Sequence, residues 1–303
     1  MSKQYIFTLL GGDKRQAVIA KRLLHVGHCV RIYGLGALSS DIVGAELFSS
    51  AEKAVSGADV VLLPLPVSRD NANLSFAANY SGDALKLSDI VRFAAKGGCG
   101  AILGGVIPAD MVKAAEASGI FICDYYKSES LQKKNALPSA EGAVMIAMEN
   151  TDKLIKGMSV LVCGYGRIGT CLASLLDRMG ARVTVMARRD ESLCEIVMHG
   201  YDAVRISENE LDRTAFDDEE YDVIINTVPH VVFTRNVMQK IANKPLYIEV
   251  ASSPGGIDVC AAREMGVEVI FAPSLPGKYA PVNAGEYIFE TVCDILRERG
   301  MEI

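Results

Sequence analysis

Short apolar runs alternate with amphipathic segments along the first third of the chain. The run YIFTLL at 5–10 predicts a strand, and segment 13–26 predicts a helix that ends at Gly27. Further strands are expected at 29–33, 58–66, 100–105 and 119–125, with a helix at 108–118 between the last two. This repeated order predicts a doubly wound parallel sheet. The long polar stretch 68–87 breaks the pattern and is expected to be a binding loop.

The same alternation resumes in the second half of the chain. A helix is expected to begin near Pro138 and Ser139, in PSAEGAVMIAMEN, and to lead into a strand at 159–163. Strands are then expected at 182–186, 201–204, 222–226, 246–250 and 267–271. The last amphipathic segment places Ile288, Val292 and Ile295 on one face, so it predicts a helix that packs back on the first domain.

The predicted fold class is therefore α/β, with two doubly wound Rossmann-like domains and an interdomain cleft. Residues 1–137 would form a substrate-side domain, completed by the final helix at 283–303. Residues 138–282 would form an NADP-binding Rossmann domain.

Composition narrows the class of protein further. The 303 residues are 50% hydrophobic but only 7% aromatic, which is typical of parallel sheets covered by helices. A net charge of −6 argues against a nucleic-acid surface, and the acidic run 217–220 is interpreted as a solvated loop. No segment resembles a signal peptide or a membrane span. Eight cysteines without a C-x-x-C pair and four scattered histidines predict a reduced, cytoplasmic protein without a bound metal.

The motif GYGRIG follows the strand at 159–163 and opens a strongly amphipathic helix. Gly164, Gly166 and Gly169 have the spacing at which glycines permit a tight turn, backbone approach to a pyrophosphate and close helix–strand packing. The motif therefore predicts a dinucleotide site that also involves Tyr165, Arg167 and Ile168. The alternative is that the glycines serve only a tight turn.

The next strand ends in Arg188 and Arg189, where a ribose-binding Asp or Glu would be expected. Two guanidiniums and no carboxylate favour a 2′-phosphate, so NADP is predicted over NAD. The alternative is that either arginine only faces solvent.

Three later strands deliver loops to the same edge of the predicted sheet. Thr227, Val228 and Pro229 are expected at the nicotinamide end of the cofactor, and His230 follows them. The loop EVASSPGG brings Ser252 and Ser253, and the loop SLPGKYAP brings Lys278.

The first domain lacks the glycine fingerprint. Gly11-Gly12-Asp13 has no third glycine at the required spacing, although Arg15 stands at a helix start and would suit a carboxylate. The alternative is a capped helix with solvated side chains.

Seven motifs occur together and in order: GGDKRQ, LPLPVSRD, PSAEGAVM, GYGRIG, NTVP, ASSPGG and LPGKYAPVNAG. In this combination the chain resembles the A-subunit family of dipicolinate synthase over essentially its whole length. The resemblance implies a fold like that of D-2-hydroxyacid and alanine dehydrogenases. It also implies NADP-dependent oxidation of dihydrodipicolinate to dipicolinate during sporulation, with a flavoprotein-like B subunit serving as the partner. Ser139, Glu141 and Lys278 are the cleft residues that the resemblance suggests.

A small dicarboxylate substrate would require cations or aligned N–H groups at two places. Arg15, Lys278, Arg69 and the Ser252–Ser253 loop are the candidates. Glu141 is the first candidate for the base that removes a ring proton, with His230 second; the alternative for Glu141 is a favourable charge at the start of its helix.

The sequence leaves two other functions open. A D-2-hydroxyacid dehydrogenase would use a histidine paired with an acid, and the final loop PGKYAPVNAGE contains no histidine. A non-catalytic, regulatory protein that binds a dinucleotide would keep the cofactor site without the chemistry. We also expect a homo-oligomer.

Overall fold

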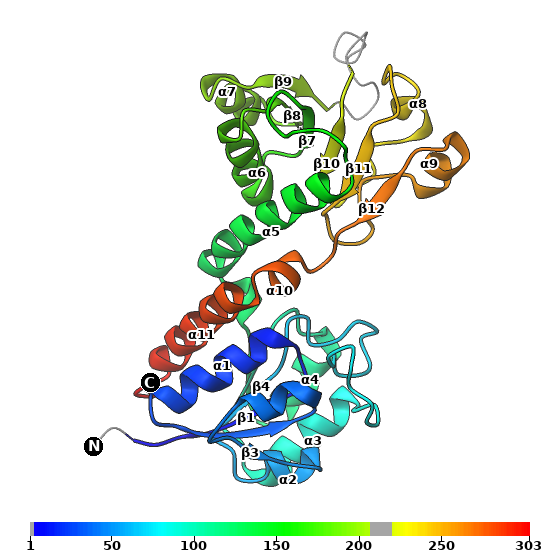
Figure 1. Ribbon diagram of the computed structural model, residues 1–303. Coiled ribbons are helices and arrows are strands. Elements are labelled where there is room, and N and C mark those ends of the chain that lie inside the picture. Colours follow the sequence, from blue (N-terminus) through cyan, green and yellow to red (C-terminus); the bar gives the residue numbers. More distant parts are fainter. Residues whose placement is uncertain (1–2, 207–219) are drawn as a thin grey trace. The chain divides into compact units, whose positions relative to one another are not determined.

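A computed structural model of the chain describes residues 3–206 and 220–303 and contains two compact α/β units. The first unit comprises Met1–Lys134 and Ala280–Ile303, and the second comprises Asn135–Tyr279. Figure 1 shows both sheets with their covering helices. The chain enters the second unit within helix α5 (Glu129–Glu149) and leaves it between α10 (Leu275–Tyr279) and α11 (Pro281–Glu298).

The sheet of the first unit has six parallel strands in the order β3-β2-β1-β4-β5-β6. These are β1 (Ile6–Leu10), β2 (Cys29–Tyr33), β3 (Glu46–Leu47), β4 (Val60–Leu62), β5 (Ala101–Gly104) and β6 (Phe121–Asp124). The helices are α1 (Lys14–His25), α2 (Ala51–Val55), α3 (Leu87–Gly97), α4 (Ala109–Ala117) and α11, with short 3₁₀ turns at Gly36–Asp41 and Tyr125–Lys127.

Both faces of this sheet are buried. Phe7 and Leu9 pack in a core with residues of α1 and α11, whereas Leu10 packs in a second core with residues of α2, α3 and α4. Successive side chains of a strand point to opposite faces, which explains the uninterrupted apolar runs. Helix α11 lies close to α1, because a Cβ atom on Gly285 would lie 2.7 Å from Cβ of Val18.

The sheet of the second unit repeats this topology, in the order β12-β11-β10-β7-β8-β9. Its strands are β7 (Ser159–Cys163), β8 (Arg182–Ala187), β9 (Asp202–Arg205), β10 (Val223–Asn226), β11 (Leu246–Glu249) and β12 (Val269–Phe271). Its helices are part of α5, then α6 (Arg167–Arg178), α7 (Asp190–Met198), α8 (Arg235–Met238), α9 (Val259–Met265) and α10. The predicted fold class of two doubly wound parallel α/β sheets is confirmed.

The predicted start of the bridging helix is wrong. Helix α5 begins at Glu129, where the Ser128 hydroxyl accepts a hydrogen bond from the N–H of Leu131, and Pro138 lies in its interior. The Ser128 cap, ten residues before Pro138, sets the start of the helix, and the proline removes the N–H that would otherwise reach the carbonyl of Lys134. Glu141 is therefore in the middle of a helix and not at its positive end.

Other expectations concern the whole chain. All eight cysteines are free thiols. Over residues 3–206 and 220–303, no helix has the length and apolarity needed to cross a bilayer, and no three His, Cys, Asp or Glu side chains form a metal-binding group. Most of the acidic run at 217–220 lies outside the described residues.

Candidate functional site

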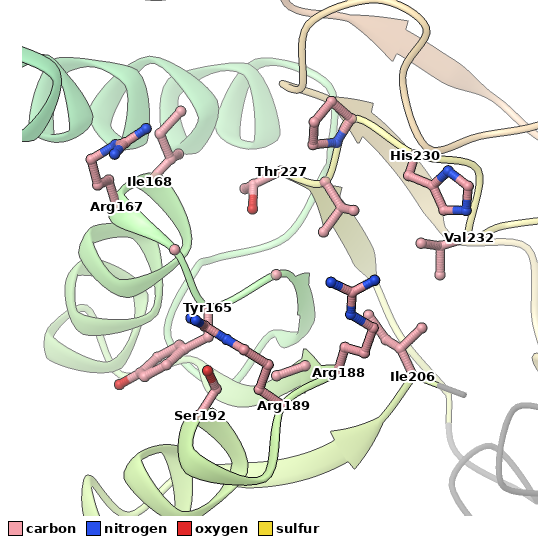
Figure 2. Close-up of a pocket in the computed structure, with 15 residues that line it drawn as sticks. Tyr165, Arg167, Ile168, Arg188, Arg189, Ser192, Ile206, Thr227, His230 and Val232 are labelled. Carbon is pink, nitrogen blue, oxygen red and sulfur yellow. The ribbon is translucent and has the colours of Figure 1, made fainter. Parts of the chain in front are cut away.

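A cavity of about 610 Å³ opens at the carboxyl edge of the second sheet, around the ends of β7, β8 and β10. Figure 2 shows its lining, which consists of Gly164, Tyr165, Gly166, Arg167, Ile168, Ala187, Arg188, Arg189, Ser192, Ile206, Thr227, Val228, Pro229, His230 and Val232. Of the predicted cofactor residues, only Gly169 is not part of the lining, because Gly169 packs against the backbone of Gly164.

The three glycines of the loop after β7 have three different surroundings. Gly164 has a φ of +98°, and a Cβ there would lie 2.5 Å from Oγ1 of Thr227. A Cβ on Gly169 would overlap the carbonyl oxygen of Gly164. Gly166 precedes α6 without a side-chain cap, and a Cβ there would meet no described atom within 4 Å. The helix N-terminus is thus open to an anionic group, as a pyrophosphate requires.

The end of β8 carries the charged part of the lining. Arg188 and Arg189 follow the strand, and Ser192 stands on the first turn of α7. Figure 2 shows Arg188, Arg189 and Ser192 among the labelled side chains of the lining. None of the described lining residues is an acid, so this part of the cavity favours a negative group.

The glycine loop is also tied to the far end of α7. The Tyr165 hydroxyl lies 2.8 Å from Nδ1 of His199, which caps that helix. Burial is the largest cause that raises the pKa of Tyr165, so the phenol stays neutral.

Sequence reasoning missed several lining residues. Ala187, Ile206 and Val232 are apolar residues near the ends of predicted strands or in the loops that follow them, and no sequence pattern distinguishes a residue of a cavity wall from a residue of the core. Ser192 had a usable signal, because it follows Arg189 by three residues and so shares the first turn of α7.

A buried polar pair at the ends of β10 and β11 was also missed. Asn226 and Glu249 are register partners and are 0% and 3% exposed. The Asn226 amide donates to Oε1 of Glu249 (2.7 Å) and to the carbonyl of Val228 (2.9 Å). The N–H groups of Ala251 (3.0 Å) and Gly256 (2.8 Å) donate to the same carboxylate.

The corresponding turn of the first unit is closed. Asp13 caps α1, and its carboxylate also pairs with the guanidinium of Arg15, which donates to the carbonyl of Leu65 as well. The Arg15 side chain is 8% exposed. The alternative of a capped helix therefore describes this turn, except that Arg15 is buried and not solvated.

A loop of the first unit fills the space above this turn. The carbonyl of Ser75 accepts from the N–H of Gly12, and Leu74 contacts Gly11. Phe76 covers Gly34, where a Cβ would overlap the ring, and stacks on Tyr80 with centroids 4.0 Å apart. Burial raises the pKa of Tyr80 to about 12. The polar stretch predicted as a binding loop thus packs residues 74–80 into the first unit's own crevice.

The motifs PSAEGA and LPGKY lie on two helices that pack together. A Cβ on Gly142 of α5 would lie 2.9 Å from the Tyr279 ring and 3.1 Å from Leu275, both on α10. Glu141 and Lys278, the neighbours of these contact residues, are both exposed.

The remaining predicted site residues have these positions. The Ser139 hydroxyl is buried and donates to the carbonyl of Asn135 (2.8 Å) within α5. The Lys278 ammonium lies 4.8 Å from the centroid of the Tyr279 ring. Ser252 and Ser253 are exposed on the loop after β11, and Arg69 is exposed on the long loop of the first unit.

These features define a class of protein. Residues 140–274 match the family described as the NAD-binding domain of S-adenosyl-L-homocysteine hydrolase, and the cavity described above lies in this range. D-lactate dehydrogenase from Escherichia coli (14% identity, TM-score 0.62, covering 98% of both chains) has the same fold. An L-alanine dehydrogenase does too (15%, TM-score 0.61, covering 96% of this chain and 90% of that one). The chain therefore has a dehydrogenase-like fold and contains a domain that matches a family of NAD-binding domains.

The resemblance to the A-subunit family of dipicolinate synthase is confirmed over nearly the whole chain. Residues 6–126 match the family described as the N-terminal domain of the dipicolinate synthase A subunit. The A subunit of dipicolinate synthase from Bacillus subtilis (strain 168) is 28% identical over 96% of this chain and 95% of its own length. The crystal structure of the Bacillus halodurans A subunit has a TM-score of 0.86 with 26% identity, covering 98% of this chain and 99% of that one. The crystal structure of its B. subtilis counterpart has a TM-score of 0.82 with 26% identity, covering 100% and 99%.

Proposed function

We propose that the chain is the A subunit of a dipicolinate synthase and oxidises dihydrodipicolinate to dipicolinate with NADP in the cytoplasm of a sporulating cell. The observation that carries the proposal is the arginine pair at the end of β8. Arg188 and Arg189 line the same cavity as the glycine loop, and no described lining residue is an acid. A carboxylate there would bind the two ribose hydroxyls of NAD, whereas guanidiniums suit a 2′-phosphate.

In this proposal each part of the cavity binds one part of the cofactor. The loop Gly164–Ile168 and the open start of α6 hold the pyrophosphate, and Arg188, Arg189 and Ser192 hold the 2′-phosphate. Thr227–Pro229 support the nicotinamide end. When bound, the cofactor accepts a hydride from the dihydropyridine ring, and a ring proton leaves as the product becomes aromatic.

The substrate contacts are proposed from chemistry and position. Lys278 and the Ser252–Ser253 loop follow neighbouring strands β12 and β11, and they supply a cation and hydroxyl groups for a carboxylate of the substrate. Glu141, exposed on α5, is the proposed base. Arg15 acts indirectly, because it fixes Asp13 and Leu65 in the first unit. Ser139 has a structural role in this proposal, because its hydroxyl donates to the carbonyl of Asn135 in the same helix.

The name of the relatives supports a partner as well. A protein named as the A subunit of an enzyme works with at least one other subunit, and we propose that the partner of this chain is a B subunit. A self-assembled homo-oligomer is compatible with that arrangement.

The test gives the purified chain the fresh product of dihydrodipicolinate synthase together with NADP. NADPH absorbance and terbium luminescence of dipicolinate should rise together, and faster with NADP than with NAD. In the variant R188S/R189S, kcat/KM for NADP should fall about 100-fold, because two charge-assisted hydrogen bonds are lost, while kcat/KM for NAD changes less than about threefold.

Arg205 offers a matched control for this test. It lies on β9, pairs with Asp190 and is not part of the cavity lining, so R205S should leave the preference for NADP unchanged. If neither signal rises, even when a B subunit is present, the proposed reaction is wrong. If turnover occurs only when the B subunit is present, the chain is not catalytically active on its own.

A further inference from the structure

Glu249 is a buried carboxylate whose hydrogen bonds connect to residues that line the proposed cofactor cavity. Both of its oxygens accept hydrogen bonds, and all three described donors are N–H groups, from Asn226, Ala251 and Gly256. A protonated acid would have to donate to an acceptor that these contacts do not offer. The geometry therefore fits the ionised form, held without a described cation in contact with it.

The hydrogen bonds of Glu249 extend to the cavity lining through two residues. Asn226 donates to the carbonyl of Val228 and accepts from its N–H (3.2 Å), so it fixes the bend that carries Thr227 and Val228. The carbonyl of Gly256 accepts from the N–H groups of Val232 and Phe233, each at 2.8 Å. The Glu249 carboxylate is thus connected by hydrogen bonds to both ends of the loop after β10, through Asn226 at its start and through Gly256 at its end.

The place of Glu249 in the sheet gives its charge a second consequence. Arg188 and Arg189 mark the half of the sheet formed by β7, β8 and β9 as the adenosine half. In a doubly wound dinucleotide fold the other half, here β10, β11 and β12, receives the nicotinamide. The oxidised nicotinamide ring carries a positive charge, and the reduced ring is neutral.

The charge of Glu249 acts beyond its own strand. Burial raises the pKa of the Cys163 thiol at the end of β7, and the negative charge of Glu249 raises it further. Cys163 directly precedes Gly164, so the field of this carboxylate reaches the base of the cofactor loop.

We propose that Glu249 is a positioning residue for the loop after β10 and that its charge makes the site favour the oxidised over the reduced cofactor. This inference rests on the proposed function, in which the cavity binds a nicotinamide cofactor that is reduced during the reaction. A preference of this kind helps the oxidised cofactor to bind and the reduced cofactor to leave.

The test compares the dissociation constants of NADP⁺ and NADPH, measured by calorimetry and by NADPH fluorescence. E249Q preserves the size of the side chain, removes the charge and replaces one acceptor oxygen by an NH2 group, so both affinities should fall. Its affinity for NADP⁺ should fall about tenfold more than its affinity for NADPH, as expected for a charge pair in a partly screened site. E249D retains the charge but shortens the side chain, so both affinities should fall together. The proposal would be overturned if E249Q lost equal affinity for NADP⁺ and NADPH. It would also be overturned if E249D changed the ratio of the two dissociation constants as much as E249Q does.

Asp222 provides a matched control on the same sheet. Its carboxylate precedes β10 at the opposite edge, where it accepts from the N–H of Ser159 (2.8 Å) and pairs with Lys153. D222N should leave the ratio of the two affinities unchanged, and a shift like that of E249Q would overturn the proposal. Circular dichroism checks that each variant is folded.

The wild-type chain gives a result that does not depend on any variant. It should bind NADP⁺ at least as tightly as NADPH, and a preference for NADPH of about tenfold or more would contradict the proposal. Failure to bind either form would contradict the proposed function instead.

Discussion

The two units share a strand order and a three-residue turn between the first strand and the first helix, yet only one turn is open. In the first unit the residue before the helix is Asp13, which caps α1 and pairs with Arg15. In the second unit it is Gly166, which has no side chain and leaves the start of α6 free of a side-chain cap. The same fold therefore provides a closed scaffold and a nucleotide site, and a few side chains decide which.

A second difference reinforces the first. Residues 74–80 pack over Gly11 and Gly34 in the first unit, where a doubly wound fold would bind its nucleotide. In the second unit the equivalent space is a cavity of about 610 Å³. The first unit is thus closed both by a charge at the helix start and by its own loop.

The largest expected effect comes from giving the second unit the cap of the first. In G166D the new carboxylate would cap α6 and face the pyrophosphate, so NADPH affinity should fall about 100-fold or more, as like charges in contact cost several kcal/mol. The melting temperature should stay the same or rise, because Asp is a good N-cap. NADPH fluorescence titration and thermal unfolding measure the two effects.

G166A separates size from charge. Its methyl group has free space within the described protein and a permitted φ of −97°, so only the approach of the pyrophosphate is affected. We expect a loss of about tenfold, since the second glycine of the motif allows close backbone contact. Equal losses in G166A and G166D would show that the charge at this position is unimportant.

The converse change opens the cap of the first unit. D13G leaves the buried guanidinium of Arg15 without its carboxylate and removes the cap of α1. Removing one partner of a buried pair costs about 3–5 kcal/mol, and since Asp13 is 39% exposed we expect a loss of about 2 kcal/mol in the free energy of unfolding by urea.

The double variant D13G/G166D tests what this opening does to binding. With the second site blocked, any NADPH affinity would come from the first unit, and none is expected because residues 74–80 still fill the crevice. Binding by the double variant would mean that the cap alone keeps the first unit closed. D13N serves as the control, because asparagine retains the cap and removes only the charge.

The parts of this comparison that sequence reasoning could predict are those with a local cause. Apolar runs and glycine stops predicted the parallel strands, and the context of Gly164, Gly166 and Gly169 predicted the glycine loop that borders the cavity. Arg188 and Arg189 were singled out because they replace an expected acid, and both line the same cavity. Each of these signals lies within one strand–turn–helix segment.

The parts that could not be predicted depend on contacts between distant segments. Pro138 suggested a helix start, but the cap at Ser128 and packing against Tyr279 and Leu275 carry α5 through the proline. Glu249 resembled the ordinary polar end of a strand. A weak signal existed, because Asn226 ends the preceding strand in the same way, and parallel neighbours place such residues side by side.

The smallest expected effect concerns the loop that closes the first unit. The N–H and side-chain amide of Asn73, the N–H of Ala72 and the hydroxyl of Ser68 donate to Asp70 and hold the pKa of that carboxyl well below its usual range. A lowered pKa means that the ionised form contributes stability above about pH 4, the usual value, and that this contribution is lost as the pH falls toward the folded-state value. D70N lacks this contribution at every pH. The difference in melting temperature between wild type and D70N should therefore shrink as the pH falls from 5 to 2.5. A difference that stays constant with pH would show that the carboxylate does not anchor the loop. NADPH affinity at neutral pH should be the same in both proteins, because Asp70 belongs to the unit whose nucleotide crevice is already closed.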